Sequence, residues 1–239
     1  MSANYSVLAK YYDRFTQNDC DYVSWSQYLY AVAAKHGAKE VVDIACGTGK
    51  MTKLLVDKGL KAVGIDDSVE MLTVAREKCK AVFVRQDMKR LELPHAMDMA
   101  ICVNDGVNYL KPSELLGFFK RVADTLKAGA PFVFDVSSPY KLTNVVGNNV
   151  FYLDEDGQTL LWSNNAMENC VEMNLTLFVD DGNGKYLRFD ERHVQYIHTD
   201  EQIVVALKSA GFEMCEITAD YGQKVAENSL RRCYYALKV

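Results

Sequence analysis

The chain has 239 residues, of which 49% are hydrophobic and 25% charged, so it can bury a sizeable core and is too apolar to be disordered. No apolar run approaches the roughly eighteen residues that would span a bilayer, and the opening MSANYSVLAKYYDRF lacks the apolar stretch of a signal peptide. The net charge of −5 argues against a protein built to grip phosphate backbones, and seven cysteines without a CxxC pair argue against a zinc site or a disulfide framework. We therefore expect a cytoplasmic protein with reduced thiols, no metal site and no membrane partner.

The first predicted elements are helical and lie between residues 5 and 37, with a break near Thr16–Asp21. From residue 39 onward, short apolar strands alternate with helices. The expected strands are 39–45, 61–66, 81–87, 97–105 and 130–137, and the expected helices are 49–58, 69–80 (capped by Ser68) and 112–127. This alternation predicts a Rossmann-like, doubly wound α/β fold whose sheet is mostly parallel, with helices on both faces.

After Pro139 the pattern changes to long alternating stretches. Turn signals at Asp156-Gly157 and Asp181–Gly184 predict three or four antiparallel strands within residues 150–198. A helix at 199–210 and an antiparallel closing strand pair, in 212–220 and 231–239, are expected to complete the sheet. The predicted organisation is thus an N-terminal helical cover (1–37), an α/β core (38–140 and 199–239) and an inserted antiparallel β lid (141–198).

Residues 151–200 hold ten acidic and three basic residues. Such an imbalance is usually a solvated face, and the functional interpretation is a lid that repels polyanions and tolerates cations.

A glycine-spaced turn, VVDIACGTGK at residues 41–50, follows the first expected strand. The dinucleotide fingerprint would need a glycine at Thr52, and the P-loop pattern is also incomplete. Two carboxylates accompany the turn: Asp43 lies inside the strand, and Asp66 ends the next one. A carboxylate in the position of Asp66 can accept hydrogen bonds from both ribose hydroxyls of a nucleoside. The carboxyl ends of parallel strands share one edge, which also places Asp87, Asn104 and Asp135 along the rim.

Five ordered motifs resemble those of class I S-adenosylmethionine-dependent methyltransferases: DIACGTG, VGIDDS, RQDMKRL, ICVNDGVNYL and LKAGAPFVFDV. The resemblance runs motif by motif over residues 5–139 and as a pattern over 199–239. It implies S-adenosyl-L-methionine as cofactor, with bare backbone beside its methionine part and carboxylates beside its amino group, ribose and adenine. The cofactor-binding residues so implied are Tyr12, Trp25, Asp43, Ala45, Gly47, Gly49, Asp66, Asp67, Asp87, Met88 and Asn104.

Several of these residues have a structural alternative. Asp43 could orient the turn through its own backbone, Asp66 could cap the following helix, and Asp87 and Asn104 could serve as turn residues.

The segments LAKYYDRF and CDYVSW resemble the opening of a small-molecule subgroup that includes glycine N-methyltransferase and the sugar N,N-dimethyltransferases. The resemblance implies that the N-terminal helices fold over the cofactor and bring an aromatic hydroxyl near the reactive methyl. Tyr12 is the candidate for this catalytic role, with Tyr22 and Trp25 beside it; the alternative is that these aromatic residues, together with Tyr5 and Tyr11, are core residues.

His193 is the second candidate catalytic residue, as a general base. It shares one face of the last inserted strand with Glu191 and Gln195. A structural role for this histidine is the alternative.

These features predict an enzyme that methylates a small molecule at nitrogen or oxygen by in-line transfer. A nucleic-acid partner is not expected, because the chain lacks an Asn-Pro-Pro-Tyr type motif, a Pro-Cys nucleophile and a basic stripe. The alternatives are a tRNA or protein methyltransferase and a non-catalytic S-adenosylmethionine-binding module; Thr52 argues against an NAD-type oxidoreductase. The oligomeric state is left open.

Overall fold

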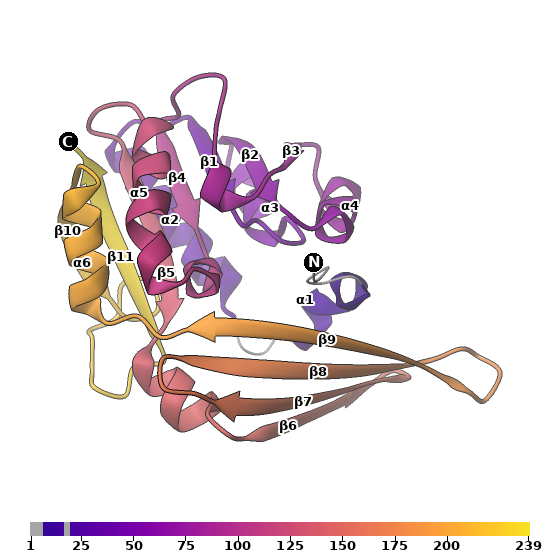
Figure 1. The fold of residues 1–239 in the computed structure, drawn as a ribbon. Coiled ribbons are helices and arrows are strands. Elements are labelled where there is room, and N and C mark those ends of the chain that lie inside the picture. The colour runs from indigo at the N-terminus through magenta and orange to yellow at the C-terminus, as the bar shows by residue number, and fades with distance from the viewer. Residues whose placement is uncertain (1–6, 17–19) are drawn as a thin grey trace.

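The computed structural model describes residues 7–16 and 20–239, in which the strands form two separate sheets (Figure 1). A seven-stranded sheet has the order β10-β11-β5-β4-β1-β2-β3, and a four-stranded antiparallel sheet has the order β6-β7-β8-β9. Tyr5 and the start of the predicted helical cover lie outside the described residues. The fold class predicted from the sequence is confirmed.

The parallel part of the larger sheet consists of the five strands expected from the alternating pattern. They are β1 (Glu40–Ile44), β2 (Lys61–Asp66), β3 (Val82–Arg85), β4 (Met99–Cys102) and β5 (Pro131–Ser137). The closing pair, β10 (Phe212–Thr218) and β11 (Arg231–Lys238), adds to β5 in antiparallel register. Because β1 pairs with both β2 and β4, the chain reverses its winding direction at β1, and a ligand crevice is expected there.

Helices cover both faces of this sheet, since neighbouring strand residues alternate between the two sides. Val41 packs with α2 (Tyr22–Lys35) and α3 (Lys50–Asp57). Val42 packs with α5 (Leu115–Asp124) and α6 (Asp200–Ser209) on the other side. The helix predicted over 112–127 is divided, because a short 3₁₀ turn, η4 (Pro112–Glu114), precedes α5.

Helix α4 (Val69–Lys78) lies beside β3 and begins as the sequence predicted. The Ser68 hydroxyl accepts a hydrogen bond from the Met71 N–H at 3.1 Å, which confirms the expected N-cap. The helix ends at Lys78 rather than Lys80, because Cys79 is already extended.

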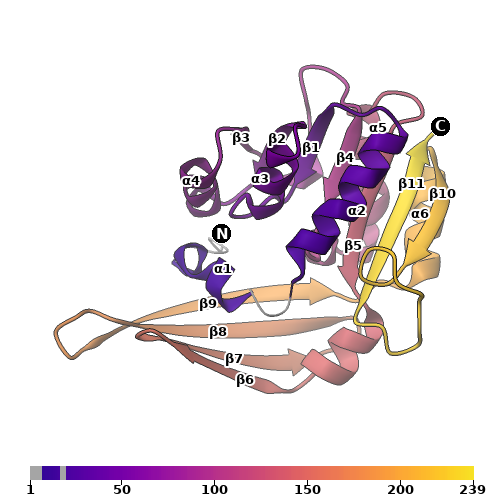
Figure 2. The same ribbon diagram turned by 180° about the vertical axis from the view of Figure 1, so that it is seen from behind.

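The N-terminal segment is less helical than predicted. It forms a 3₁₀ turn, η1 (Leu8–Lys10), and a four-residue helix, α1 (Tyr12–Phe15), before α2 begins. Figures 1 and 2 show α1 between the four-stranded sheet and the core helices α3 and α4. Leu8 packs against the four-stranded sheet, while the Asp13 carboxylate accepts hydrogen bonds from Thr48 and Lys78 of the core. This short segment therefore contacts both the four-stranded sheet and the α/β core.

The inserted sheet is made of four antiparallel strands: β6 (Val150–Glu155), β7 (Gln158–Ala166), β8 (Cys170–Asp180) and β9 (Tyr186–Tyr196). Asp156 and Gly157 both have positive φ, as a tight hairpin turn requires. The sheet is entered through a π-helix, η5 (Lys141–Val146), so the first part of the expected β insertion is helical.

Across the described residues, no helix combines the length and apolarity needed to cross a bilayer. The same part of the chain holds no group of three or more His, Cys, Asp or Glu side chains placed to bind a metal ion.

Candidate active site

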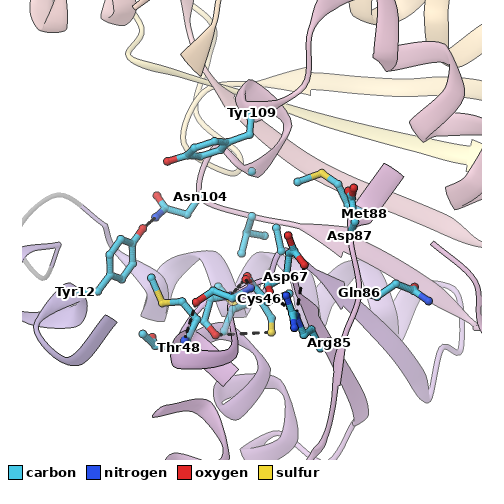
Figure 3. A pocket seen from close by; sticks show the side chains of 18 of the residues that line it. Tyr12, Cys46, Thr48, Asp67, Arg85, Gln86, Asp87, Met88, Asn104 and Tyr109 are labelled. Carbon is cyan, nitrogen blue, oxygen red and sulfur yellow. Dashed lines mark hydrogen bonds and ion pairs between the residues drawn. The ribbon is translucent and has the colours of Figure 1, made fainter. Parts of the chain in front are cut away.

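A cleft of about 750 Å³ opens at the carboxyl ends of β1 to β4, at the crevice expected from the strand order. Figure 3 shows side chains from both sides of this cleft. Eight of the eleven residues predicted to bind the cofactor line it: Tyr12, Ala45, Gly47, Asp66, Asp67, Asp87, Met88 and Asn104. The other three predicted residues do not line the cleft: Trp25, Asp43 and Gly49.

The turn between β1 and α3 presents its backbone to the cleft. Ala45 and Gly47 both have left-handed backbone, with φ of 55° and 51°. The Gly47 N–H donates to Asp66 Oδ2 at 2.8 Å, which fixes the turn to the end of β2. A Cβ on Gly47 would meet nothing nearer than Met71 Sδ at 3.9 Å, so the space in front of this glycine belongs to the cleft.

Gly49 has a purely internal role. It is the N-cap of α3 with a φ of 69°, and a Cβ there would lie 2.9 Å from Ala75 Cβ and 3.0 Å from the Phe83 ring. The absence of a side chain lets the start of α3 pack against α4 and β3. The sequence pattern predicts cofactor approach at this glycine; in the structure Gly49 does not line the cleft, and helix packing requires the missing side chain.

Gly49→Ala is expected to lower the free energy of unfolding by about 2 kcal/mol, because it adds steric overlap to an unfavourable φ. Gly59→Ala is the matched control, since Gly59 also has a positive φ but nothing lies within 4 Å of its Cβ position. The control should cost only about 1 kcal/mol. Urea denaturation of both variants measures the difference, and equal losses would contradict the packing role.

Asp66 accepts two backbone hydrogen bonds at the rim of the cleft and also lines the cleft. Its Oδ2 accepts from Gly47 N–H and its Oδ1 accepts from Ser68 N–H at 2.9 Å. A carboxylate has about four lone-pair sites, so each oxygen retains capacity for a hydroxyl donor. Burial raises the pKa of Asp66, and the neighbouring backbone N–H groups oppose that effect. Asp67 lies further out, with a side chain 73% exposed and 3.6 Å from Arg85 Nε.

Asp43 lies beneath the turn, fully buried. Its Oδ2 accepts from the Thr52 hydroxyl at 2.5 Å, while its Oδ1 has no hydrogen-bond partner among the described residues. Burial raises the pKa of Asp43 to about 7. Thr52, the residue that breaks the dinucleotide fingerprint, therefore has a positive role as the partner of this carboxylate.

We expect the affinity for S-adenosylmethionine to rise as the pH increases through about 7. Below that pH Asp43 is mostly protonated and neutral, and above it the ionised carboxylate attracts the sulfonium of the cofactor. Asp43→Asn should flatten this dependence while keeping the Thr52 contact. Calorimetric titrations from about pH 6 to about pH 8 test it, and comparing the two proteins cancels any titration of the ligand itself. An unchanged slope in the variant would refute the role of Asp43.

The far wall of the cleft is formed by the turn after β3. Asp87 caps the 3₁₀ turn η2 (Met88–Arg90) by accepting from the Lys89 N–H at 2.9 Å. In Figure 3, Asp87 and Met88 lie across the cleft from Tyr12. Both predicted features of Asp87 are thus present, since it is a turn residue and it also lines the cleft.

Asn104 connects the end of β4 to α1. Its Nδ2 donates to the Tyr12 hydroxyl at 2.9 Å, and its Oδ1 accepts from Arg231 Nη2 at 3.1 Å. Asn104 and Asp105 have left-handed backbone, and their N–H groups each donate to Asp135 at 2.7 Å. The strained turn is therefore held by a carboxylate on the neighbouring strand β5.

Behind this turn lies a buried ion pair between Arg231 and Asp135, with Asp135 fully buried and Arg231 4% exposed. The Tyr221 hydroxyl also donates to Asp135. The Trp25 ring stacks on the guanidinium, with its centroid 4.6 Å from Arg231 Cζ. The structure therefore places Trp25 behind Arg231, outside the set of residues that line the cleft.

A second, smaller cavity of about 140 Å³, here called the inner pocket, lies between the rim and the four-stranded sheet. It shares Tyr12, Asn104 and Tyr109 with the cleft, so the two cavities meet at these three residues. Apolar side chains of the sheet form much of its wall, and polar groups from both sheets complete it. The residues used below are Cys20, Asp105, Lys141, Leu153, Leu160, Trp162, His193, Gln195 and Arg231.

His193 is 2% exposed and points into the inner pocket beside Gln195. Its Nε2 is 3.3 Å from Glu191 Oε2, and its Nδ1 is 3.5 Å from the Tyr109 hydroxyl. On β9, His193 and Gln195 therefore line the pocket, while the Glu191 side chain contacts His193. Tyr12 and His193, the two candidate catalytic residues, line the same cavity.

Comparison with known proteins gives the family. A model of the methyltransferase domain matches residues 41–129. A protein of Geobacillus sp. (strain WCH70), described as a methyltransferase, is 31% identical over 98% of this chain and 99% of its own length. The crystal structure of an S-adenosylmethionine-dependent methyltransferase from Clostridium acetobutylicum ATCC 824 is 32% identical and superposes with a TM-score of 0.89, covering 98% of both chains. The chain is a class I S-adenosylmethionine-dependent methyltransferase.

The methyltransferase also has relatives in the subgroup that its N-terminal segment predicted. The sugar N-methyltransferase KedS8 from Streptoalloteichus sp. ATCC 53650 has the same fold, with a TM-score of 0.79 at 23% identity over 95% of this chain and 92% of its own. Glycine N-methyltransferase of Oryctolagus cuniculus is 24% identical over 66% of this chain and 62% of its own length. The resemblance stated from the motifs is confirmed.

The cleft of this methyltransferase fits S-adenosylmethionine chemically. The buried Asp43 and the half-buried Asp66 give the cleft a negative bias that suits a sulfonium, and the Gly47 turn leaves open space beside them. The Asp66 oxygens retain acceptor capacity for hydroxyl donors.

Two polar residues of the methyltransferase site were missed by sequence reasoning. Tyr109 lines both cavities, yet in the sequence it stood unremarked inside the motif ICVNDGVNYL. Arg231 lies 127 residues from its partner Asn104. The available signal was an arginine directly before the apolar stretch CYYAL of a buried strand, because a buried arginine requires an anionic partner.

Proposed function

We propose that this methyltransferase transfers a methyl group to a nitrogen or oxygen atom of a small molecule held in the inner pocket. The observation that carries the proposal is that the inner pocket adjoins the cofactor cleft at Tyr12, Asn104 and Tyr109. An acceptor there would lie next to the reactive end of the cofactor, as in-line displacement requires. The pocket's volume of about 140 Å³ suits a metabolite-sized acceptor better than a macromolecule.

The four-stranded sheet and α1 support the enclosure that methyl transfer needs. Leu8, Leu160 and Leu177 form an apolar cluster that joins the N-terminal segment to the sheet. We assign the cover role to residues 1–37 and the lid role to residues 141–198, around the core formed by 38–140 and 199–239. Exclusion of water strengthens every electrostatic contact inside the site.

When bound, S-adenosylmethionine supplies a methyl group on a positively charged sulfur that is already a good leaving group. The protein's task is therefore alignment, and the fixed chain from Arg231 through Asn104 to the Tyr12 hydroxyl serves it at the junction of the two cavities. Relatives named as N-methyltransferases favour nitrogen as the acceptor atom. An amine must lose its proton to attack, and His193, held by Glu191, is positioned to receive it.

The test is S-adenosylhomocysteine production over a panel of small amines and alcohols, with tRNA and a mixed peptide pool as competing acceptors. Turnover on a small molecule supports the proposal. Turnover confined to tRNA or peptides would overturn it, and tight cofactor binding without turnover on any acceptor would favour a non-catalytic module.

His193→Asn is expected to lower kcat on an amine acceptor by about tenfold or more at neutral pH. The loss should shrink as the pH rises, because solvent then removes the amine proton without help. His95→Asn is the matched control, since His95 lies on the surface with its side chain 61% exposed. An equal loss at every pH would indicate a structural role for His193.

A further inference from the structure

The charge of the inner pocket differs from the charge of the insertion that covers it. None of the ten acidic residues of 151–200 lines the inner pocket. The charged side chains that line it are Lys141, Arg231 and Asp105. The acidic residues noted in the sequence therefore do not form the wall of the inner pocket, although Glu191 contacts the pocket-lining His193.

One of these three charges is neutralised within the protein, because the Arg231 guanidinium pairs with Asp135 and also donates to Asn104. Asp105 Oδ2 accepts from the neutral Ser137 hydroxyl at 2.9 Å, which orients the carboxylate but leaves its charge in place. The pocket therefore offers a ligand one charge of each sign, Asp105 and Lys141.

Lys141 is different. Its backbone N–H donates to Ser138 Oγ at 3.0 Å, but its ammonium has no hydrogen-bond or ion-pair partner among the described residues. It is half-buried at the start of η5, where β5 leads into the inserted sheet. Cys20 lines the same pocket, where burial raises the pKa of its thiol to about 11; the charges of Arg231 and Lys141 act to lower that pKa, and those of Asp105 and Asp135 act to raise it.

We propose that the Lys141 ammonium binds a carboxylate of the methyl acceptor, so that the substrates of this enzyme are small carboxylic acids bearing a methylatable nitrogen or oxygen. The inference rests on the proposed function. A protonated amine held beside Lys141 would be repelled, and a phosphate dianion would need a second uncompensated cation, which Arg231 does not provide. Leu153, Leu160 and Trp162 offer apolar wall for the carbon skeleton between the two ends.

The test uses two probes of nearly the same shape, 4-methylpentanoate and 4-methylpentanamide, titrated into the full-length protein saturated with S-adenosylhomocysteine. The acid should bind about tenfold or more tightly than the amide, as expected for a charge-assisted hydrogen bond in a partly dry site. Lys141→Met keeps the apolar stem and should remove this preference. Lys141→Arg should retain most of it.

Lys185→Met is the matched control, because Lys185 lies exposed at the β8–β9 hairpin and should leave both affinities unchanged. Unchanged affinity for S-adenosylhomocysteine shows that each variant is folded. Equal affinity for the two probes, no binding of the acid, or a preference that survives in Lys141→Met would overturn the assignment.

The probe titration needs no turnover, so its result is separate from the test of methyl transfer. A selective acid site in a protein that methylates nothing would refute the proposed function and leave the subsite standing. Methylation of uncharged acceptors, without a preference for the acid probe, would support the proposed function and refute the carboxylate subsite. On a carboxylate acceptor, Lys141→Met should raise KM with little change in kcat.

Discussion

Replacing Asp66 with alanine is expected to weaken S-adenosylmethionine binding by about 1–3 kcal/mol. The carboxylate accepts from Gly47 and Ser68 N–H groups and lines the cleft, so its loss removes the proposed acceptor for the ribose hydroxyls and loosens the turn at the same time. Isothermal titration calorimetry on purified protein measures the effect.

Asp57→Ala provides the control for that experiment. Asp57 carries the same charge at the end of α3, but it does not line the cleft and its side chain is 53% exposed. It should change the affinity far less. If both variants bound the cofactor as the parent protein does, the assignment of Asp66 to the cofactor would be wrong.

The second large effect concerns stability. Arg231→Met is expected to lower the free energy of unfolding by about 3–5 kcal/mol, because it leaves the Asp135 carboxylate buried without its counter-ion. The double variant with Asp135→Asn should lose less than the sum of the two single variants, since the uncompensated charge is then gone. Urea denaturation gives all three values.

A surface pair supplies the comparison. Arg188 and Asp190 also form an ion pair, but their side chains are 62% and 57% exposed. Arg188→Met should therefore cost about 0–1 kcal/mol. A similarly small loss for Arg231→Met would show that the buried pair contributes little.

Much of the fold could be predicted because its signals are local. Apolar strands such as 61–66, a cap such as Ser68 and a hairpin turn such as Asp156-Gly157 each leave a mark within a few residues. The prediction was weakest at the N-terminus, where α1 is one short helix held by contacts with the four-stranded sheet and with the α/β core. Tertiary contacts shape that segment more than its own periodicity does.

The same difference between local signals and distant contacts separates the site residues that could be predicted from those that could not. The turn at Gly47 and the carboxylate at Asp66 could be predicted because they follow strands that end at one edge. The roles of Gly49 and Trp25 could not, since a Cβ clash with Ala75 and stacking on Arg231 depend on residues far away in the sequence. The same holds for the role proposed for Lys141, which rests on its place in the inner pocket and on its lack of a partner among the described residues.

The position of α1 has a kinetic consequence. Tyr12 forms part of the wall of both cavities, while Asp13 fastens the same helix to the core and Leu8 anchors the preceding turn to the inserted sheet. With an acceptor in the inner pocket, as proposed, any movement of α1 that opens one cavity also changes the wall of the other. We therefore expect the release of the two products to be coupled through Tyr12 and its neighbours.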